Sequence, residues 1–144
     1  MFTSSIEAEA AFYDAFSNAD IDSMMRVWAQ GPEIACIHPS GPRLAGSAEI
    51  RQSWTMILTE QVLRSFDLRG RIIHGSENVR VHTLEENISV PGTAFVAPPV
   101  LATNVYQRLA DGWFMVLHHA SVAPSGLSGD DVSDQDQSAP VSLH

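Results

Sequence analysis

The hydrophobic positions in the first part of the chain recur at the spacing of helices. Ser4 and Glu7 stand three residues apart, as in a capping box, and apolar residues then follow at helical intervals to about Asn18. Asp20 is placed to cap a second, shorter helix, and the chain turns at Gly31. This pattern predicts two helices that are joined by a short link and share one apolar face.

A third helix is predicted over residues 47–61, where the amphipathic pattern is clearest. Its apolar stripe is formed by Ile50, Trp54, Ile57, Leu58 and Gln61. Before this helix, residues 33–38 alternate in the manner of a short strand, and residues 43–45 return after a proline-rich turn. The middle of the chain is therefore predicted to be a short β pair followed by a helix.

The next part of the chain is typical of strands. Four strands are predicted, over residues 66–72, 78–90, 100–109 and 113–122. Within the second of these the apolar positions change parity, and we interpret the change as a β-bulge near His82–Thr83. Bulges bend long strands, so the pattern predicts a curved sheet.

The last predicted strand has an unusual distribution of apolar residues. Residues 113–117 are apolar on both faces of the strand, which is typical of a position in the centre of a sheet. The helices of one small domain cover only one face of a four-stranded sheet. An apolar patch would remain in water on the other face, so we expect the chain to form a homodimer through that face.

The composition fits one globular domain with a polar tail. Of the 144 residues, 44% are hydrophobic and 17% are charged, and a chain of this length buries a core without metal or disulfide support. From residue 124 onward the sequence is acidic, rich in Ser and Asp, and without periodicity. We therefore expect an α+β domain over residues 1–123 and a flexible tail over residues 124–144.

Charge and residue usage exclude several classes of function. The net charge of −9 argues against nucleic-acid binding, which needs clustered basic residues. All eight basic residues are arginine, which excludes Schiff-base chemistry and a P-loop lysine. The single cysteine, Cys36, excludes an intrachain disulfide and fits an inert buried thiol. Because the sequence has neither a membrane-length apolar run nor the pattern of a secretory signal, we expect a cytoplasmic protein that does not bind membranes.

Three local motifs, together with the order of the predicted elements, resemble one superfamily. The motifs are Asn18-Ala19-Asp20-Ile21-Asp22 with Trp28-Ala29, Ile37-His38-Pro39 through Gly46 with Ile50 and Trp54, and Asp111-Gly112-Trp113 with His118-His119-Ala120-Ser121. They are similar to segments of the nuclear transport factor 2-like (NTF2-like) superfamily, which includes ketosteroid isomerase and SnoaL-like polyketide cyclases. The resemblance implies a cone-shaped, cystatin-like α+β fold, in which a curved mixed or antiparallel sheet wraps around three N-terminal helices.

The same resemblance points to His38 as a general base. His38 precedes Pro39 at the position where ketosteroid isomerase has its catalytic aspartate. The tyrosine that polarises the substrate carbonyl in that enzyme falls near Phe12 or Tyr13, of which Phe12 is the better match. Both departures argue against isomerase activity as such, although a histidine can still act as a base. The alternative is a structural histidine at a strand end that donates to a backbone carbonyl.

Other candidate residues follow from strand parity and helix stripes. Asn104 and Tyr106 share one face of a strand, which would place polar groups inside the cone, with Tyr106 as a hydrogen-bond donor. His118 and His119 are adjacent in a strand and must face opposite sides, so one of them would face the cavity. The candidate ligand-binding residues are Trp28, Trp54, Asn104, His118 and His119, and the two tryptophans have a plainer interpretation as core residues.

Two functions remain open from the sequence. The first is small-molecule binding inside the cone, with acid–base chemistry of an isomerase, cyclase or hydrolase type on a small hydrophobic substrate; the second is a non-catalytic dimerisation or association module. We expect no cofactor and no metal, because no group of metal-ligating residues has a recognisable spacing. Glu85 and Glu86 face opposite sides of their strand, so one of them could turn inward, although the plainer interpretation is that they are solvated at the surface. Convergence of polar groups inside the cone favours the first function, and an interior closed by aromatic rings favours the second.

Overall fold

The computed structural model describes residues 1–124, which form three helices and six strands. The helices are α1 (Ser5–Ser17), α2 (Ile21–Val27) and α3 (Ser47–Leu58). The strands are β1 (Ala35–Ile37), β2 (Arg43–Ala45), β3 (Ser65–Gly75), β4 (Val79–Ser89), β5 (Val100–Leu109) and β6 (Gly112–Val122). The predicted α+β class is confirmed, and apart from its first residue the predicted tail lies outside the described residues.

The two N-terminal helices begin at the caps that the sequence predicted. The Ser4 hydroxyl accepts a hydrogen bond from the amide of Glu7 at 3.0 Å, and the Asp20 carboxylate accepts one from the amide of Ser23 at 3.1 Å. Each bond satisfies a backbone donor that a helix leaves unpaired in its first turn. Local sequence therefore determines where α1 and α2 begin.

Two helices end earlier than their sequence patterns predicted. Trp28 lies just beyond the end of α2 in an extended conformation and forms a β-bridge with Met115. Gln61, which was predicted to extend the apolar stripe of α3, is exposed and has a φ of 57°, in the left-handed region. A residue in that region cannot continue a right-handed helix, so the chain turns away toward β3.

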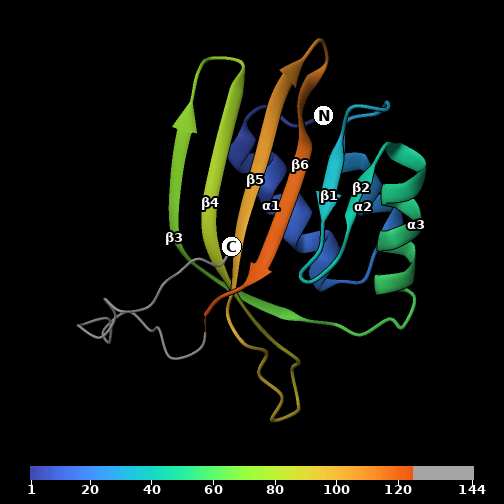
Figure 1. The fold of residues 1–144 in the computed structure, drawn as a ribbon, viewed down its shortest axis with the longest axis vertical. Helices are drawn as coiled ribbons and strands as arrows, with labels where there is room; N and C mark the ends of the chain where they lie inside the picture. Colours follow the sequence, from blue (N-terminus) through green and yellow to red (C-terminus); the bar gives the residue numbers. More distant parts are fainter. Residues whose placement is uncertain (125–144) are drawn as a thin grey trace.

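All six strands form one sheet in the order β2-β1-β6-β5-β4-β3. The short β1–β2 pair extends the four long antiparallel strands, because β1 pairs in parallel with β6. β6 therefore lies inside the sheet, as its two apolar faces predicted. Figure 1 shows α1 and α2 behind this sheet and no helix in front of it. We call the side that packs against the helices the inner face and the uncovered side the outer face.

Two bulges bend the sheet, and neither lies where the sequence placed one. β3 has an extra residue after Arg69, and β6 has one after Met115. The pairing of β4 with β5 continues without a break through His82, so the predicted bulge near His82–Thr83 is wrong. The parity change misled the prediction because β4 has apolar residues on both faces: Val81 faces outward, whereas Leu84 faces inward with His82 and is buried.

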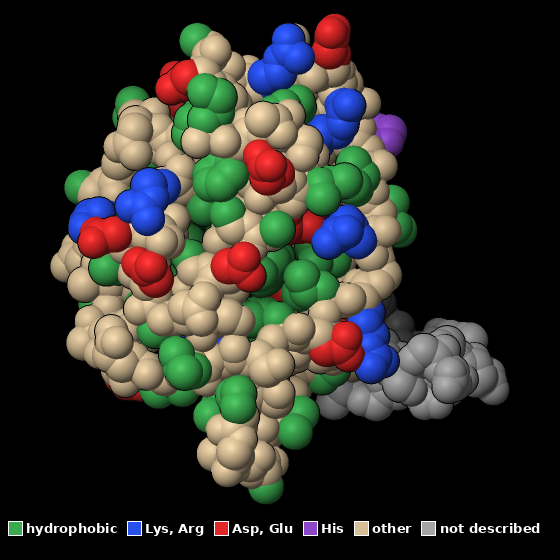
Figure 2. Space-filling view, turned by 180° about the vertical axis from the view of Figure 1, so that it is seen from behind, with side chains coloured by type: hydrophobic (Ala, Val, Ile, Leu, Met, Phe, Trp, Pro, Cys, Tyr) green, Lys and Arg blue, Asp and Glu red, His purple; other side chains and the backbone are tan. Residues whose placement is uncertain are grey.

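The core lies between the helices and the inner face of the sheet. Its fully buried large side chains include Phe12, Met24, Ile50, Trp54 and Met115. Figure 2 shows the helical side from the outside, where acidic and basic side chains are spread among small apolar patches. None of the described helices is both long and apolar enough to cross a bilayer.

Candidate functional site

A cluster of polar side chains is buried where α1 crosses the inner face of β4, β5 and β6. We call it the inner polar cluster, and its members are Ser5, Glu9, Tyr13, His82, Glu86, Asn104, Tyr106 and His118, all buried. The three residues from α1 are spaced four apart, which places them on one side of the helix. On the sheet, the register sets His82, Asn104 and His118 side by side on adjacent strands.

Glu9 is the charged centre of the cluster. One oxygen, Oε2, accepts hydrogen bonds from the Tyr106 hydroxyl at 3.0 Å and the Asn104 amide at 3.2 Å, while Oε1 accepts one from Arg71 at 2.8 Å. Nδ1 of His82 lies 3.1 Å from Oε1, close enough for an ion pair although not aligned for a hydrogen bond. Burial alone raises the pKa of Glu9, but these contacts with His82, Asn104 and Tyr106 lower it overall, so the carboxylate is ionised.

Glu86 has a different protonation state from Glu9. Its one hydrogen-bond donor in the described structure is the Tyr13 hydroxyl, which lies 2.6 Å from Oε2. Burial, together with the nearby negative charge of Glu9, raises the pKa of Glu86 to about 7 and outweighs the bond from Tyr13. Glu86 therefore gains and loses a proton near neutral pH, which is the property of a general acid or base.

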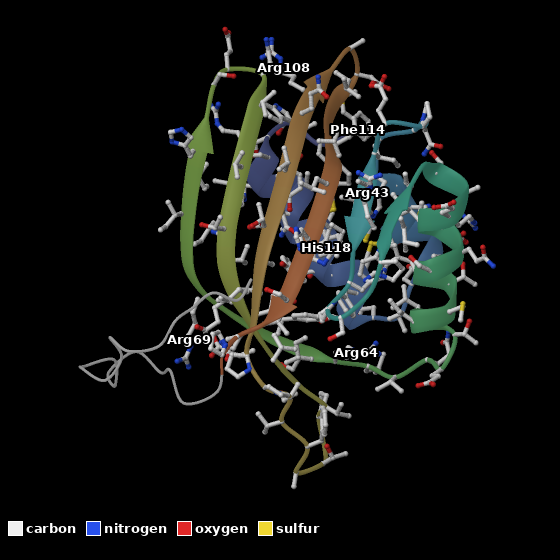
Figure 3. The ribbon with its side chains drawn as sticks, in the orientation of Figure 1. Arg43, Arg64, Arg69, Arg108, Phe114 and His118 are labelled. Atoms are coloured by element: carbon white, nitrogen blue, oxygen red, sulfur yellow. The ribbon has the colours of Figure 1, made fainter. Side chains whose placement is uncertain are left out.

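Asn104 connects the two carboxylates to His118. Its amide nitrogen donates to the Tyr13 hydroxyl at 3.0 Å as well as to Glu9, and its oxygen lies 2.6 Å from Nδ1 of His118. Because an amide oxygen only accepts, the proton of His118 is on Nδ1. Complete burial lowers the pKa of His118 to about 3, so this ring is neutral. His118 is the member of the adjacent pair that faces inward, near the middle of β6 (Figure 3).

His38 lies beside the cluster and makes different contacts. Its Nε2 is 3.1 Å from the hydroxyl of Ser53 on α3, and that hydroxyl donates to the carbonyl of Ile50. Nε2 therefore carries the proton and donates to Ser53. Burial lowers the pKa of His38, and the ring packs edge-on against Trp54. Neighbouring Cys36 is buried, and burial raises the pKa of its thiol to about 12. No hydrogen bond between described residues joins His38 to Asn104 or Tyr106, the candidate donors inside the cone.

Aromatic rings fill the interior beside the cluster. We call them the aromatic layer, and they are Phe12, Phe16, Trp54 and Phe66. Trp54 is completely buried, and its indole nitrogen has no hydrogen-bond partner among the described residues. The ring of His118 lies 5.0 Å from that of Phe12, centroid to centroid, so the layer covers one side of the cluster. Phe16 and Phe66 are only half-buried and form the outer edge of the layer.

The remaining sequence-predicted residues lie away from the cluster. Trp28 lies alongside β6, bridged to Met115, and lines a hollow of about 440 Å³ together with Phe114. His119 points to the outer face, where it lines a second hollow of about 480 Å³ with Thr83, Glu85 and Thr103. The structure thus brings together Asn104, Tyr106 and His118, and separates Trp28 and His119 from them.

Glu9 and His82 are among the cluster members that the sequence analysis did not single out. Glu9 falls on the apolar side of α1, beside Ala8 and Phe12, and a lone acid in an apolar stripe is the signal that could have revealed it. His82 was taken for part of a bulge, although its parity with Leu84 and Glu86 marks the inner face. For the pair of adjacent glutamates, the structure shows that Glu86 is the one that turns inward.

A family model and one curated relative match this chain. The model for the SnoaL-like domain matches residues 7–125. The F-box protein SKIP8 of Arabidopsis thaliana is 29% identical over 120 residues, which are 81% of this chain and 48% of that protein. The chain therefore spans about half the length of this relative.

Several solved structures have the same fold. A candidate association domain of calcium/calmodulin-dependent protein kinase type II from Thiobacillus denitrificans is 35% identical with a TM-score of 0.80, covering 86% of this chain and 98% of that one. A candidate dehydratase of the NTF2-like family from Streptomyces avermitilis is 29% identical with a TM-score of 0.73, and the match covers 82% of this chain and 92% of that one. A protein from Nostoc punctiforme with a cystatin-like fold has a TM-score of 0.70 at 16% identity, and the match covers 87% of this chain and 97% of that one. The predicted cystatin-like architecture is confirmed.

Proposed function

The chain belongs to the SnoaL-like domain family. We propose that it binds a small molecule at the inner polar cluster and that Glu86 exchanges a proton with this ligand. Members of one fold family perform unrelated chemistry, so the proposal has to come from the site itself. It replaces the sequence-based choice of His38 as the base with a glutamate that belongs to the connected network.

The observation that supports this proposal is the burial of two carboxylates in one hydrogen-bonded network. Burying a charge costs several kcal/mol unless partners compensate, and an apolar core of the same volume is often as stable or more so. A core selected for folding alone has no need of Glu9 and Glu86. Costly buried groups with shifted pKa values gather at functional sites, because that is where proton transfer needs them.

The chemistry of the cluster and the aromatic layer indicates the class of ligand. Protonated Glu86 can donate to a carbonyl oxygen, and ionised Glu86 can accept a proton from a hydroxyl or an activated carbon. The rings of Phe16, Trp54 and Phe66 offer apolar contact, and displacement of the half-buried edge of the layer would admit the ligand. We therefore propose a small, mainly apolar compound with one carbonyl or hydroxyl group.

Thermal-shift titration with a panel of cyclic ketones and phenols tests the proposal. A compound at a hundred times its Kd stabilises the fold by about 2.7 kcal/mol, which is readily detected. Glu86→Gln should weaken binding at least tenfold, whereas Glu85→Gln, which changes the adjacent glutamate on the outer face, should leave it unchanged. Equal binding by the two variants, or no shift with any compound in the panel, would contradict the proposal.

Self-association through the outer face is the second candidate function. Val81, Val105 and Leu117 are neighbours across the centre of this face, and each is only half-buried in the single chain. The similar Thiobacillus denitrificans protein is described as a candidate association domain. The strands of a sheet lie about 4.8 Å apart and extend about 3.3 Å per residue, so the outer face of the four long strands has a flat area of roughly 650 Å². Stable interfaces bury about 800 Å² of accessible surface per partner. The outer face is therefore close to the size that a stable dimer needs.

Analytical ultracentrifugation tests this second candidate. The wild-type chain should sediment as a dimer at micromolar concentration, and Val105→Arg should sediment as a monomer, because a buried unpaired charge is costly. Met56→Arg is the matched control, since Met56 is exposed on α3, away from the outer face. A wild-type monomer, or equal association by the two arginine variants, would overturn the proposal.

A further inference from the structure

The strand register defines a centre on the outer face. Two rows of outward side chains cross all six strands. The first row is Ile72, Thr83, Thr103, His119, Ile37 and Arg43, and the second is His74, Val81, Val105, Leu117, Ala35 and Ala45. The neighbouring row through Glu85 and Leu101 crosses only four strands. His119 lies on β6, the third strand of the six, and is therefore close to the centre of the face.

His119 is exposed in the single chain, and the residues paired with it on the two adjacent strands are uncharged. Thr103 on β5 and Ile37 on β1 lie directly across from it, and Leu117, two residues before it on β6, begins the apolar part of the second row. A protonated imidazole at this position has no carboxylate directly opposite it on either adjacent strand. A partner surface that covers His119 would therefore remove the ring from water with no carboxylate paired to it; Glu85 lines the same hollow from β4, two strands away.

The other charged or titratable groups near the two central rows lie toward their margins. Arg43 is at the β2 edge and His74 at the β3 edge, and Figure 3 shows Arg43 and Arg69 toward opposite sides of the sheet. Glu85 is two strands from β6 and accepts a hydrogen bond from Asn87 at 2.9 Å. Arg69 pairs with a neighbouring acid, Asp67, on its own strand. Glu85 therefore has no ion-pair partner among the described residues, and it lies on a different row from His119.

We propose that His119 makes self-association of this chain dependent on pH, with the dimer formed by neutral His119 and separated when His119 takes up a proton. This inference rests on the second proposed function, association through the outer face. The partner that covers His119 is a second copy of this chain.

Symmetry supplies the physical reason. In a twofold dimer the same patch is used on both protomers, so the centre of the face on one copy meets the centre of the face on the other. Two His119 side chains would then be buried close together. Burial disfavours a charged imidazole, and two like charges repel, so both effects oppose protonation in the dimer.

The sign and the size of the effect follow from linkage. The exposed ring in the free protomer binds a proton more readily than the buried ring in the dimer, so falling pH favours the free protomer. Release of one histidine proton on entry into an interface weakens association by about tenfold between pH 7.5 and 5.5, the range in which histidine side chains change charge. Two such groups in each dimer give about a hundredfold increase in the dissociation constant.

Sedimentation equilibrium of the whole chain at pH 7.5 and 5.5 tests the inference. The wild type should dissociate about a hundredfold more readily at pH 5.5, and His119→Gln should lose most of this dependence while still dimerising at pH 7.5. His74→Gln is the matched control, because it removes an exposed histidine at the edge of the same face and should keep the wild-type response. Circular dichroism verifies that each variant is folded at both pH values.

The possible outcomes separate this inference from the function on which it rests. A wild type that is monomeric at both pH values overturns association itself. A dimer of equal strength at both pH values overturns the role of His119 and leaves association intact. A pH dependence that persists in His119→Gln but disappears in His74→Gln assigns the effect to the edge of the face and also overturns the inference.

Discussion

Replacing Glu86 by glutamine should change how the stability of the fold depends on pH. Glutamine has nearly the same shape as the protonated acid, and its oxygen can still accept the hydrogen bond from Tyr13. The substitution therefore removes the ionisation of the side chain and leaves the packing of the inner polar cluster close to that of the wild type.

The magnitude follows from the shift in pKa. The pKa of Glu86 is about 7 in the folded chain against an ordinary value of 4.5, so between these values the folded state holds a proton that the unfolded state has released. Stability is therefore highest below pH 4.5 and is lost as the pH rises toward 7. From pH 5 to pH 8 the loss due to this one group is about 2–3 kcal/mol, given about 1.4 kcal/mol for each pKa unit.

Urea unfolding at pH 5 and pH 8 measures the effect. Glu86→Gln should be similar to the wild type at pH 5 and more stable by about 2–3 kcal/mol at pH 8, which corresponds to a higher melting temperature by roughly 6–15 °C for a domain of this size. Glu85→Gln is the control on the outer face. Other titrating groups are common to all three proteins, so they cancel in the difference between each variant and the wild type.

One result would refute the reasoning. If Glu86→Gln and the wild type keep a constant difference in stability from pH 5 to pH 8, then Glu86 does not ionise in this range in the folded chain. The proton-exchange role would then have to be abandoned, even if the cluster still binds a ligand.

Three further predictions concern other parts of the chain. Trp54→Ala should cost about 3–5 kcal/mol in urea unfolding, because the completely buried indole packs against Phe12 and Phe16; a much smaller loss would mean that Trp54 lines an open cavity. His38→Ala should cost only about 1 kcal/mol, the worth of its bond to Ser53, and a hundredfold fall in turnover of an identified substrate at unchanged stability would instead support the role of a base. Truncation after Pro124 should leave the melting temperature within a few degrees by calorimetry, because the tail lacks the apolar content to offset its ordering entropy; a large drop would show that the tail contributes to the fold.

Local patterns in the sequence were sufficient for the element types and for the fold class. Ser4 and Asp20 act as caps within three residues of their partners, so neighbouring residues alone decide where the first two helices begin. The apolar residues on both faces of β6 were enough to place that strand inside the sheet. In such cases the interaction that selects the structure lies within one segment of the chain, where spacing is visible directly.

The composition of the candidate site, in contrast, was decided by tertiary structure. The bond between Asn104 and Glu9 joins residues 95 positions apart, and it exists only because α1 crosses β5 with one side of the helix against one face of the strand. The inner face of β4 could not be read from its own residues, since apolar and polar residues occur on both faces, so His82 was missed. Whether Glu86 or Glu85 turns inward was decided in the same way, by the register that pairs β4 with its neighbours.

The protonation states also depend on the assembled fold. Glu9 and Glu86 are the same residue type, yet the pKa of Glu9 is lowered and that of Glu86 is raised, because four side chains contact the first carboxylate and one donates to the second. A sequence determines which groups can ionise. Burial and the number of hydrogen bonds, which exist only after distant segments have packed together, determine which of them do so near neutral pH.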